Sequence, residues 1–302
     1  MPQKLPPMPS RKTIRFRKVL SAPGLLTAVR KQFENIPEHR RGRKVYSLPD
    51  VLMSGLAMFG LKYPSLLQFD HARLERTVKA NLKQLYGVEQ APCDTQMREV
   101  LDPVNPNSLR SAFTTIHKQL QRQTVLVKYQ YLGGYLVSID GTGQFSSTHL
   151  SCPDCCSRTL RNNHRQYYHQ LLGAVIVHPQ RAQVLPLFPE AITRQDGDTK
   201  NDCERNASKR LLPALRQAFP KLKMLIVEDA LASNVPHLKL LEELSLSYII
   251  VVKPKEHAYL FDHVSQLQRS GKGIQFETIS ANGIGRRYHL VNQVPLNASH
   301  PE

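Results

Sequence analysis

The stretch Tyr135-Leu-Val-Ser-Ile-Asp-Gly-Thr-Gly143 determines the predicted fold. Its first five residues favour a buried β-strand, which runs directly into the carboxylate of Asp140 and then into two glycines. A carboxylate at the end of a buried strand is costly unless a partner offsets its charge. A second acid, Asp229, follows the apolar run that begins at Leu225 in the same way. Asp140 and Asp229 are therefore candidate members of one site.

The charge of the chain indicates its class of partner. Its 302 residues include 41 Lys and Arg against 24 Asp and Glu, which gives a net charge of +17 and a pI near 9.8. Such an excess is typical of proteins that bind nucleic acid or an anionic membrane surface. The sequence has no apolar run of about 18 residues and no apolar secretion signal. Five cysteines fit a reducing compartment, so we expect a soluble intracellular protein that faces nucleic acid.

Two N-terminal segments are predicted to precede the sheet. Residues 1 to 44 carry twelve Lys and Arg against two Glu and are predicted to form a basic arm. This segment either contacts DNA phosphates or is a solvated tail. The candidate DNA contacts are Arg40, Arg41, Arg43 and Lys44. Residues 45 to 132 read as α-helical, and a first helix capped by Ser47 is apolar almost all round, which predicts burial. We expect a helical DNA-binding domain, either with a helix-turn-helix or as a plain bundle.

From Gly133 the pattern changes from helical to strand-like. Expected strands at 135–140, 167–178 and 182–188 precede a helix at 201–219, a strand at 223–228, a helix at 236–244, a strand at 248–252 and a helix at 257–269. This β-β-β-α-β-α-β-α order predicts an α/β fold with a mixed sheet and flanking helices, the layout of the ribonuclease H-like fold, over residues 133 to 270. In that layout the first and fourth strands are adjacent at the sheet centre. Asp140 and Asp229 would then be neighbours.

Two neighbouring carboxylates predict a site for a hard cation. Because the two charges repel, either one carboxylate holds a proton or a cation lies between them. Oxygen ligands suit Mg²⁺ or Mn²⁺, and such ions support in-line displacement at phosphorus. The alternative for each acid alone is a helix cap or a turn, and Asp229 precedes a segment that it could cap.

The segment between Asp140 and the second predicted strand contains a second set of candidate ligands. Cys152 and Cys155 have the Cys-x-x-Cys spacing that forms half of a zinc site. Two histidines, with His164 and His169 as the candidates, would complete a tetrahedral set within a Cys/His insert at 149 to 169. The alternative is a pair of reduced structural cysteines beside histidines that face DNA.

Further basic residues lie in the second half of the chain. The candidate DNA contacts there are Lys200, Arg205, Lys209, Lys253 and Lys255. Residues 201 to 206 could instead only cap the helix that they begin.

Several sequence blocks resemble those of bacterial insertion-sequence transposases with a DDE core, in the group outside the named insertion-sequence families. The blocks are Tyr46-Ser-Leu-Pro-Asp50, Leu52-Met-Ser-Gly-Leu-Ala-Met-Phe59, Leu61-Lys-Tyr-Pro-Ser-Leu-Leu-Gln-Phe-Asp70, Tyr167-Tyr-His-Gln170, Gln195-Asp-Gly197, Lys200-Asn-Asp-Cys-Glu-Arg-Asn206 and Val227-Glu-Asp-Ala-Leu-Ala-Ser-Asn234. The resemblance runs from about residue 30 to the end. It implies a ribonuclease H-like core that depends on Mg²⁺ and cuts and joins DNA at terminal inverted repeats. Asp140 and Asp229 match the first and second acids of the triad.

The resemblance also implies a partner and a location. We expect double-stranded DNA as the substrate, a homodimer in the DNA complex, no membrane contact, and a bacterial cytoplasm with the protein on the nucleoid. The third acid of such enzymes is a Glu on a helix that follows a β-rich insertion. Residues 271 to 302 resemble the start of that insertion, and Glu256, Glu277 and Glu302 lie on no such helix, so we expect a chain shortened before its third acid and weak or inactive alone.

Three functions are therefore open. The first is a DDE transposase, the second a non-catalytic DNA-binding remnant that occupies inverted repeats or pairs with a full-length copy, and the third a ribonuclease H-like nuclease without strand transfer.

Overall fold

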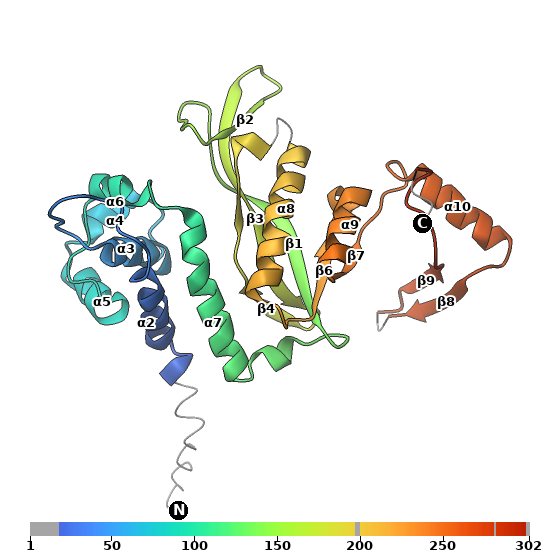
Figure 1. The fold of residues 1–302 in the computed structure, drawn as a ribbon, viewed down its shortest axis with the longest axis horizontal. Helices are drawn as coiled ribbons and strands as arrows, with labels where there is room; N and C mark the ends of the chain where they lie inside the picture. The colour runs from blue at the N-terminus through green and yellow to red at the C-terminus, as the bar shows by residue number, and fades with distance from the viewer. Residues whose placement is uncertain (1–17, 197–199, 281, 300–302) are drawn as a thin grey trace, which may run out of the picture. The chain divides into compact units, whose positions relative to one another are not determined.

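The computed structural model describes residues 18–196, 200–280 and 282–299. The chain divides into two compact units (Figure 1). One unit contains the described residues up to Leu132 together with His178–Phe188, and the other contains Gly133–Val177 and the described residues from Pro189 onward. The basic residues before Lys18 lie outside the described part.

The first unit is mainly helical, and its helices share one apolar core. The core includes the fully buried side chains of Val51, Met53 and Phe69. The elements are α2 (Ala22–Phe33), α3 (Leu48–Gly60), α4 (Leu66–Ala72), α5 (Arg76–Tyr86), α6 (Asp94–Leu101), α7 (Arg110–Arg122), the 3₁₀ turns Pro106–Leu109 and Leu126–Tyr129, and strand β4 (Arg181–Pro186).

Helix α3 follows its sequence pattern closely. The Ser47 hydroxyl accepts a hydrogen bond from the backbone N–H of Asp50 at 3.2 Å, so the predicted cap is confirmed. Val51, Met53 and Ala57 are fully buried, as the almost wholly apolar helix predicted. Phe59, near its end, is nevertheless 73% exposed.

The prediction of a basic arm up to residue 44 is wrong for residues 22–33, which form helix α2. Ser21 caps this helix, and Val29 and Phe33 are buried in the core of the helical unit. The high charge of the segment hid the apolar stripe at helical spacing. Arg30 is also used structurally, because its Nη2 lies 2.6 Å from Asp50 Oδ1.

The second unit is built on a mixed sheet, which confirms the predicted α/β class. Its core strands run in the order β2-β3-β1-β6-β7, and β5 also pairs with β3. Strand β1 is antiparallel to β3 and parallel to β6, which is parallel to β7. The first and fourth predicted strands, β1 and β6, are therefore adjacent as expected. The bounds are β1 (Tyr135–Ser147), β2 (Cys156–Thr159), β3 (Arg165–His178), β5 (Glu190–Ile192), β6 (Met224–Glu228) and β7 (Ser247–Ile250).

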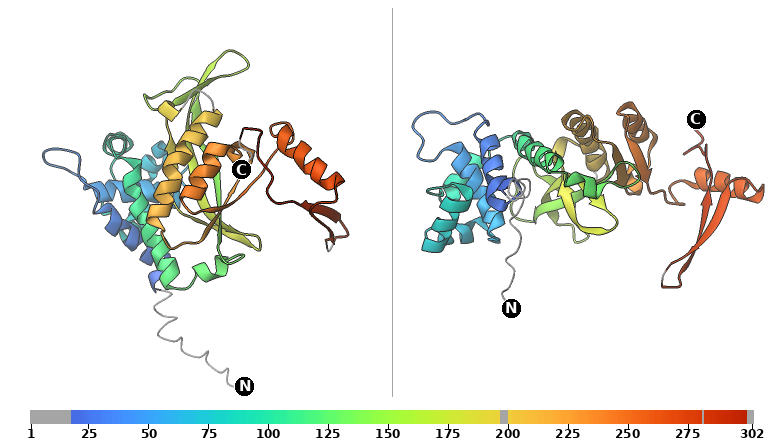
Figure 2. Two further views of the ribbon diagram at one scale, coloured as in Figure 1. Left: turned by 45° about the vertical axis from the view of Figure 1, so that its right-hand side comes forward. Right: turned by 90° about the horizontal axis from the view of Figure 1, so that it is seen from below.

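Helices α8 (Lys200–Ala218) and α9 (Val235–Glu243) lie side by side on one face of the sheet (Figures 1 and 2). Leu211 and Leu215 of α8 and Leu241 of α9 are fully buried, as are Val137 and Ile226 on the two central strands. Further along the chain come α10 (Ala258–Arg269) and the hairpin of β8 (Ile274–Ile279) and β9 (Gly285–Leu290). No helix within the described residues is both long and apolar enough to cross a membrane.

An ionic network links α8 to β5 and to the 3₁₀ turn Arg194–Asp196; its two carboxylates are buried, whereas the Arg210 side chain is 40% exposed. The Arg210 Nε lies 2.7 Å from Glu190 Oε1, and its Nη2 lies 2.9 Å from Asp196 Oδ2. Burial alone would raise the pKa of Asp196, but hydrogen bonds from Arg210 and from the Thr193 backbone outweigh it and lower that pKa. The network fixes the rotation of α8 about its axis and thus the face that this helix presents to the sheet.

Candidate active site

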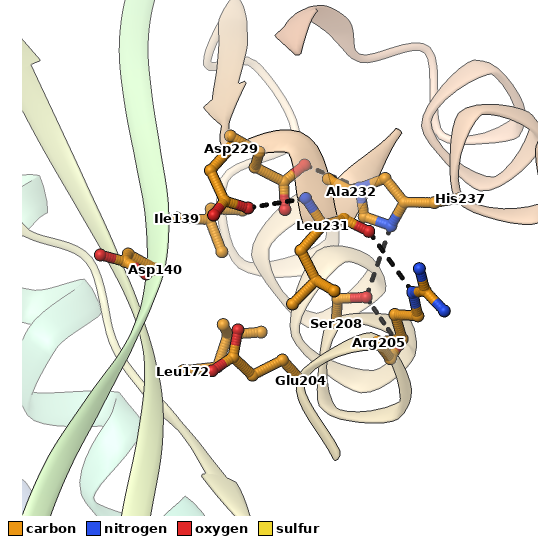
Figure 3. A pocket seen from close by; sticks show the side chains of 11 residues that line it. Ile139, Asp140, Leu172, Glu204, Arg205, Ser208, Asp229, Leu231, Ala232 and His237 are labelled. Atoms are coloured by element: carbon orange, nitrogen blue, oxygen red, sulfur yellow. Dashed lines mark hydrogen bonds and ion pairs between the residues drawn. The ribbon is translucent and has the colours of Figure 1, made fainter. Parts of the chain in front are cut away.

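Asp140 and Asp229 reach the same pocket from the two central strands. The parallel pairing of β1 with β6 ends at Ser138 opposite Val227, and each acid lies two residues beyond that pair. Both acids line one pocket together with Glu204 of α8 (Figure 3). The predicted neighbourhood of the two acids therefore follows from strand order alone.

Asp140 is not at the end of its strand, because β1 continues to Ser147 with an irregularity between Gly143 and Phe145. The side chain of Asp140 is exposed, and its Oδ1 accepts a hydrogen bond from the backbone N–H of Gly141 at 2.8 Å. An exposed carboxylate carries little desolvation cost. The premise that Asp140 needs a partner because it is buried is therefore wrong.

Asp229 directly follows β6 and is also exposed. Its Oδ1 accepts a hydrogen bond from the backbone N–H of Leu231 at 2.9 Å and so caps the 3₁₀ turn Ala230–Ala232. The capping interpretation of Asp229 is confirmed. It uses one carboxylate oxygen and leaves the second oxygen to the pocket.

Glu204 is the pocket acid that the sequence analysis did not single out. Its Oε1 accepts a hydrogen bond from Gln170 Nε2 at 2.6 Å, so β3 orients a side chain of α8. Gly141 leaves the room for this pair, because a Cβ at that position would overlap both Glu204 Oε1 and Gln170 Nε2. Both residues lie in blocks that carry the transposase resemblance, and their presence in those blocks was the available signal.

A buried polar chain forms the inner wall of the pocket. His237 Nε2 lies 2.7 Å from Glu228 Oε2, and His237 Nδ1 lies 3.4 Å from the Ser208 hydroxyl. All three side chains are buried, and they come from α9, β6 and α8 respectively. These two contacts link α8 and α9 to the end of β6, next to Asp229.

Asp140, Asp229 and Glu204 have the carboxylate chemistry that suits a hard cation, but their oxygen atoms do not all lie within 4.8 Å of one another. Asp140 and Asp229 make no ion pair with any residue in the part of the chain that the structure describes. Carboxylate oxygens are the ligands that Mg²⁺ and Mn²⁺ prefer. Within the described part of the chain, such a cluster is formed instead by Cys152, Cys155 and His169, whose donor atoms all lie within 4.8 Å of one another.

The predicted zinc ligands are thus brought together in part. The Sγ atoms of Cys152 and Cys155 lie 3.3 Å apart, and His169 Nε2 lies 3.2 Å and 3.4 Å from them. His164 is not a member of this group, and its prediction as a ligand is wrong. It precedes β3, so five residues of extended chain separate it from His169, roughly 16 Å at the usual rise.

Some of the predicted DNA contacts lie beside the acid pocket. Arg205 lines that pocket, and Arg205 and Lys209 line an adjoining hollow with His237 and Pro236. Both basic side chains are exposed. Lys200 begins α8, and its side chain lies outside the described residues.

The other predicted contacts lie elsewhere. Lys253 and Lys255 are exposed in the turn before α10. Arg41, Arg43 and Lys44 are exposed as well. Arg40 differs, because its guanidinium donates to both oxygens of Glu38, at 2.9 and 2.7 Å, and to the Tyr46 carbonyl at 2.9 Å. The Arg40 hydrogen bond also lowers the pKa of Glu38 to about 2.

A second hollow follows β1 beyond Asp140. Gly141, Gly143 and Phe145 line it from β1, and Arg158 and Tyr168 line it from β2 and β3. The Arg158 guanidinium lies over the Tyr168 ring, 5.4 Å from its centroid. A cation stacked on an aromatic face is a common surface for nucleic acid.

The later acids do not line the pocket of Asp140 and Asp229. Glu277 on β8 pairs with Arg287 at 2.7 Å, and Glu256 lies 4.0 Å from Lys253. Glu302 lies outside the described residues.

Comparison with known proteins finds no family model that matches this chain and no match among curated proteins.

Proposed function

We propose that the chain is a transposase of the DDE type, whose second unit is a ribonuclease H-like core that cleaves and joins DNA. The observation that carries this proposal is the equal position of Asp140 and Asp229, each two residues past the last pair of two adjacent parallel strands. The strand order supports it, since an antiparallel pair followed by parallel strands is the order expected for that fold. The transposase-like sequence blocks supply the reaction class.

Asp140, Asp229 and Glu204 would hold Mg²⁺ or Mn²⁺. When bound, the metal would activate the attacking oxygen and stabilise the leaving oxygen at phosphorus. Gln170 orients Glu204 through its hydrogen bond, and Gly141 keeps the space for that pair open. Glu204 lines the pocket and would serve as the third acid in place of one after residue 271. We therefore expect activity, whereas the sequence alone predicted a weak or inactive chain.

The DNA would contact basic and aromatic side chains on both sides of the acids. Arg205 and Lys209 are placed to contact phosphates beside the pocket. Arg158 and Tyr168 line the hollow along β1, where a base or a sugar can stack. A duplex that spans both hollows would pass Asp140.

The test is cleavage and joining of a labelled duplex that carries the inverted repeats flanking the coding sequence. With Mg²⁺ or Mn²⁺ we expect nicked and joined products, and none with chelator. Asp140→Asn, Asp229→Asn and Glu204→Gln should each lower the rate by at least about 100-fold, the usual effect of removing one group that stabilises the transition state. Glu243→Gln, an exposed acid of α9 outside the pocket, is the matched control and should have no effect.

A non-catalytic DNA-binding protein is the second candidate, and the spread of the three carboxylates favours it. It predicts retention of the same duplex without any product, whatever metal is added. Cleavage without joining, and equal cleavage of RNA–DNA hybrids, would instead indicate a nuclease.

A further inference from the structure

Three donor atoms meet at one point, two from the loop that joins β1 to β2 and one from strand β3. Cys152 Sγ, Cys155 Sγ and His169 Nε2 lie between 3.2 and 3.4 Å from one another. Cys155 is buried, His169 is half-buried, and Cys152 is exposed. Each pair of atoms is thus within hydrogen-bonding distance, and the group opens to solvent on the side of Cys152.

These separations are close to those that one zinc ion imposes. Zinc bonds of about 2.3 Å to sulfur and 2.0–2.1 Å to nitrogen place tetrahedral ligands about 3.8 Å apart for two sulfurs and about 3.6 Å for sulfur and nitrogen. The three observed distances are shorter than these by less than about 0.5 Å. Small side-chain rotations would therefore fit the group around an ion.

The sheet brings the ligands together before any ion binds. His169 pairs with Phe145 across β1 and β3, and the neighbouring Tyr168 pairs with Cys156 at the start of β2. The loop that carries Cys152 and Cys155 therefore begins after the residue opposite Tyr167 and ends opposite Tyr168, within two residues of His169. Within the loop, the Cys155 N–H donates to the Cys152 carbonyl at 3.2 Å, and the Cys152 N–H donates to Cys155 Sγ at 3.2 Å. Backbone N–H donors of this kind support a metal-bound thiolate.

We propose that Cys152, Cys155 and His169 bind one zinc-class divalent ion with three protein ligands and a fourth position open to solvent. Thiolate and imidazole donors select such an ion over Mg²⁺. Cys156 is excluded as the fourth ligand, because its Sγ contacts the Ile192 carbonyl inside the core at 3.8 Å. No other described Cys, His, Asp or Glu joins the group.

The ion would clamp the loop to β3 at a position that matters for the acid pocket. Successive residues of a strand point to opposite faces, so the ion at His169 and the Gln170 amide lie on opposite faces of β3. Gln170 donates to Glu204 on the helix-covered face. The clamp therefore stabilises the strand segment that orients a pocket acid, while it leaves that acid to a different and harder cation.

Metal content of the full-length chain tests this site independently of DNA cleavage. After purification with zinc and dialysis we expect about one zinc per chain, and cobalt in its place should give the intense visible and near-ultraviolet bands of thiolate coordination. Cys152→Ser and His169→Ala should each lose the ion and the cobalt bands. His164→Ala in the same hairpin and Cys93→Ser in the helical unit are the matched controls and should keep both.

Thermal unfolding gives a second readout. Zinc should raise the Tm of the wild-type chain and of the two controls, and it should leave Cys152→Ser and His169→Ala unchanged, because an ion that binds only the folded state stabilises it. A wild-type chain without metal and without cobalt bands would overturn the proposal. So would equal metal loss in His164→Ala, or a mass lower by two hydrogens in the wild-type peptide that contains Cys152 and Cys155 and no cysteine from elsewhere in the chain, which indicates a Cys152–Cys155 disulfide instead.

Discussion

Gly141 shows how one missing side chain shapes the candidate site. The residue follows Asp140 on β1, and the hydrogen-bonded pair of Gln170 and Glu204 occupies the space that its Cβ would fill. Gly143, two residues on, points to the same side of the strand by alternation, yet a Cβ there would meet no atom within 4 Å. Only the first of these two glycines is required by packing.

Replacing Gly141 with Ala should therefore destabilise the chain, while Gly143→Ala should not. The new methyl group must displace Gln170 or Glu204, and overpacking of this kind costs about 1–3 kcal/mol. Urea denaturation measures the change in the free energy of unfolding. In a Gly141→Ala chain that also carries Glu204→Ala, the penalty should shrink, because the second change empties the occupied space. Equal penalties for Gly141→Ala and Gly143→Ala would contradict the packing argument.

The sequence allowed us to predict only the part of the candidate site that follows from the order of the strands. Asp140 and Asp229 follow apolar strands, so strand order alone brings them together. Glu204 and Gln170 meet through side chains of a helix and a strand, and no spacing in the sequence encodes that contact. The prediction of His164 as a ligand was wrong because the chain between it and His169 is extended. Residues five apart in sequence are then far apart in space.

At the scale of elements, helices and strands with a strong apolar periodicity were predicted well, whereas the shortest strands were not predicted. Helix α8 and strands β3 and β6 lie within two residues of their expected bounds. Strands β2 and β5, with four and three residues, were not predicted, because so short a segment cannot show a periodic pattern of apolar residues. Both exist because β3 offers them backbone partners, which is a tertiary cause.

Helix α7 carries a buried histidine that should make the helical unit sensitive to acid. His117 is 5% exposed, and burial lowers its pKa to about 4. The unfolded chain takes up this proton near pH 6.5, whereas the folded chain takes it up only near pH 4. Stability should therefore fall as the pH drops from 6.5 towards 4, by on the order of 3 kcal/mol in all.

Thermal unfolding between pH 7 and pH 4 measures this effect. His117→Gln should flatten the dependence of Tm on pH, whatever its effect on Tm at neutral pH. His71→Gln, at an exposed histidine of α4, is the matched control and should keep the wild-type slope. Identical slopes for the wild type and His117→Gln would show that other groups govern the acid response.

At the scale of the whole molecule, the net charge of +17 is unevenly distributed along the chain. Residues 1 to 44 contribute +10 of it, and part of that charge is used within the fold. Arg30 pairs with Asp50, and Arg40 is held by Glu38, so neither guanidinium is free for a phosphate. Arg41, Arg43 and Lys44 are exposed and make no ion pair with another described residue. These three are the better candidates for DNA contact.

The salt dependence of DNA binding tests that assignment. Each phosphate contact contributes about −0.9 to the slope of log K against log salt concentration, so replacing Arg41, Arg43 and Lys44 with Gln should make the slope less negative by about 2 to 3. Fluorescence anisotropy with a labelled duplex at several salt concentrations measures it. A control with the same change in charge replaces three exposed residues of α7 and the turn after it, Lys118, Arg122 and Lys128. If both triple variants shift the slope equally, the chain binds DNA through its overall charge, and if only the first does, the segment after α2 contacts the phosphates directly.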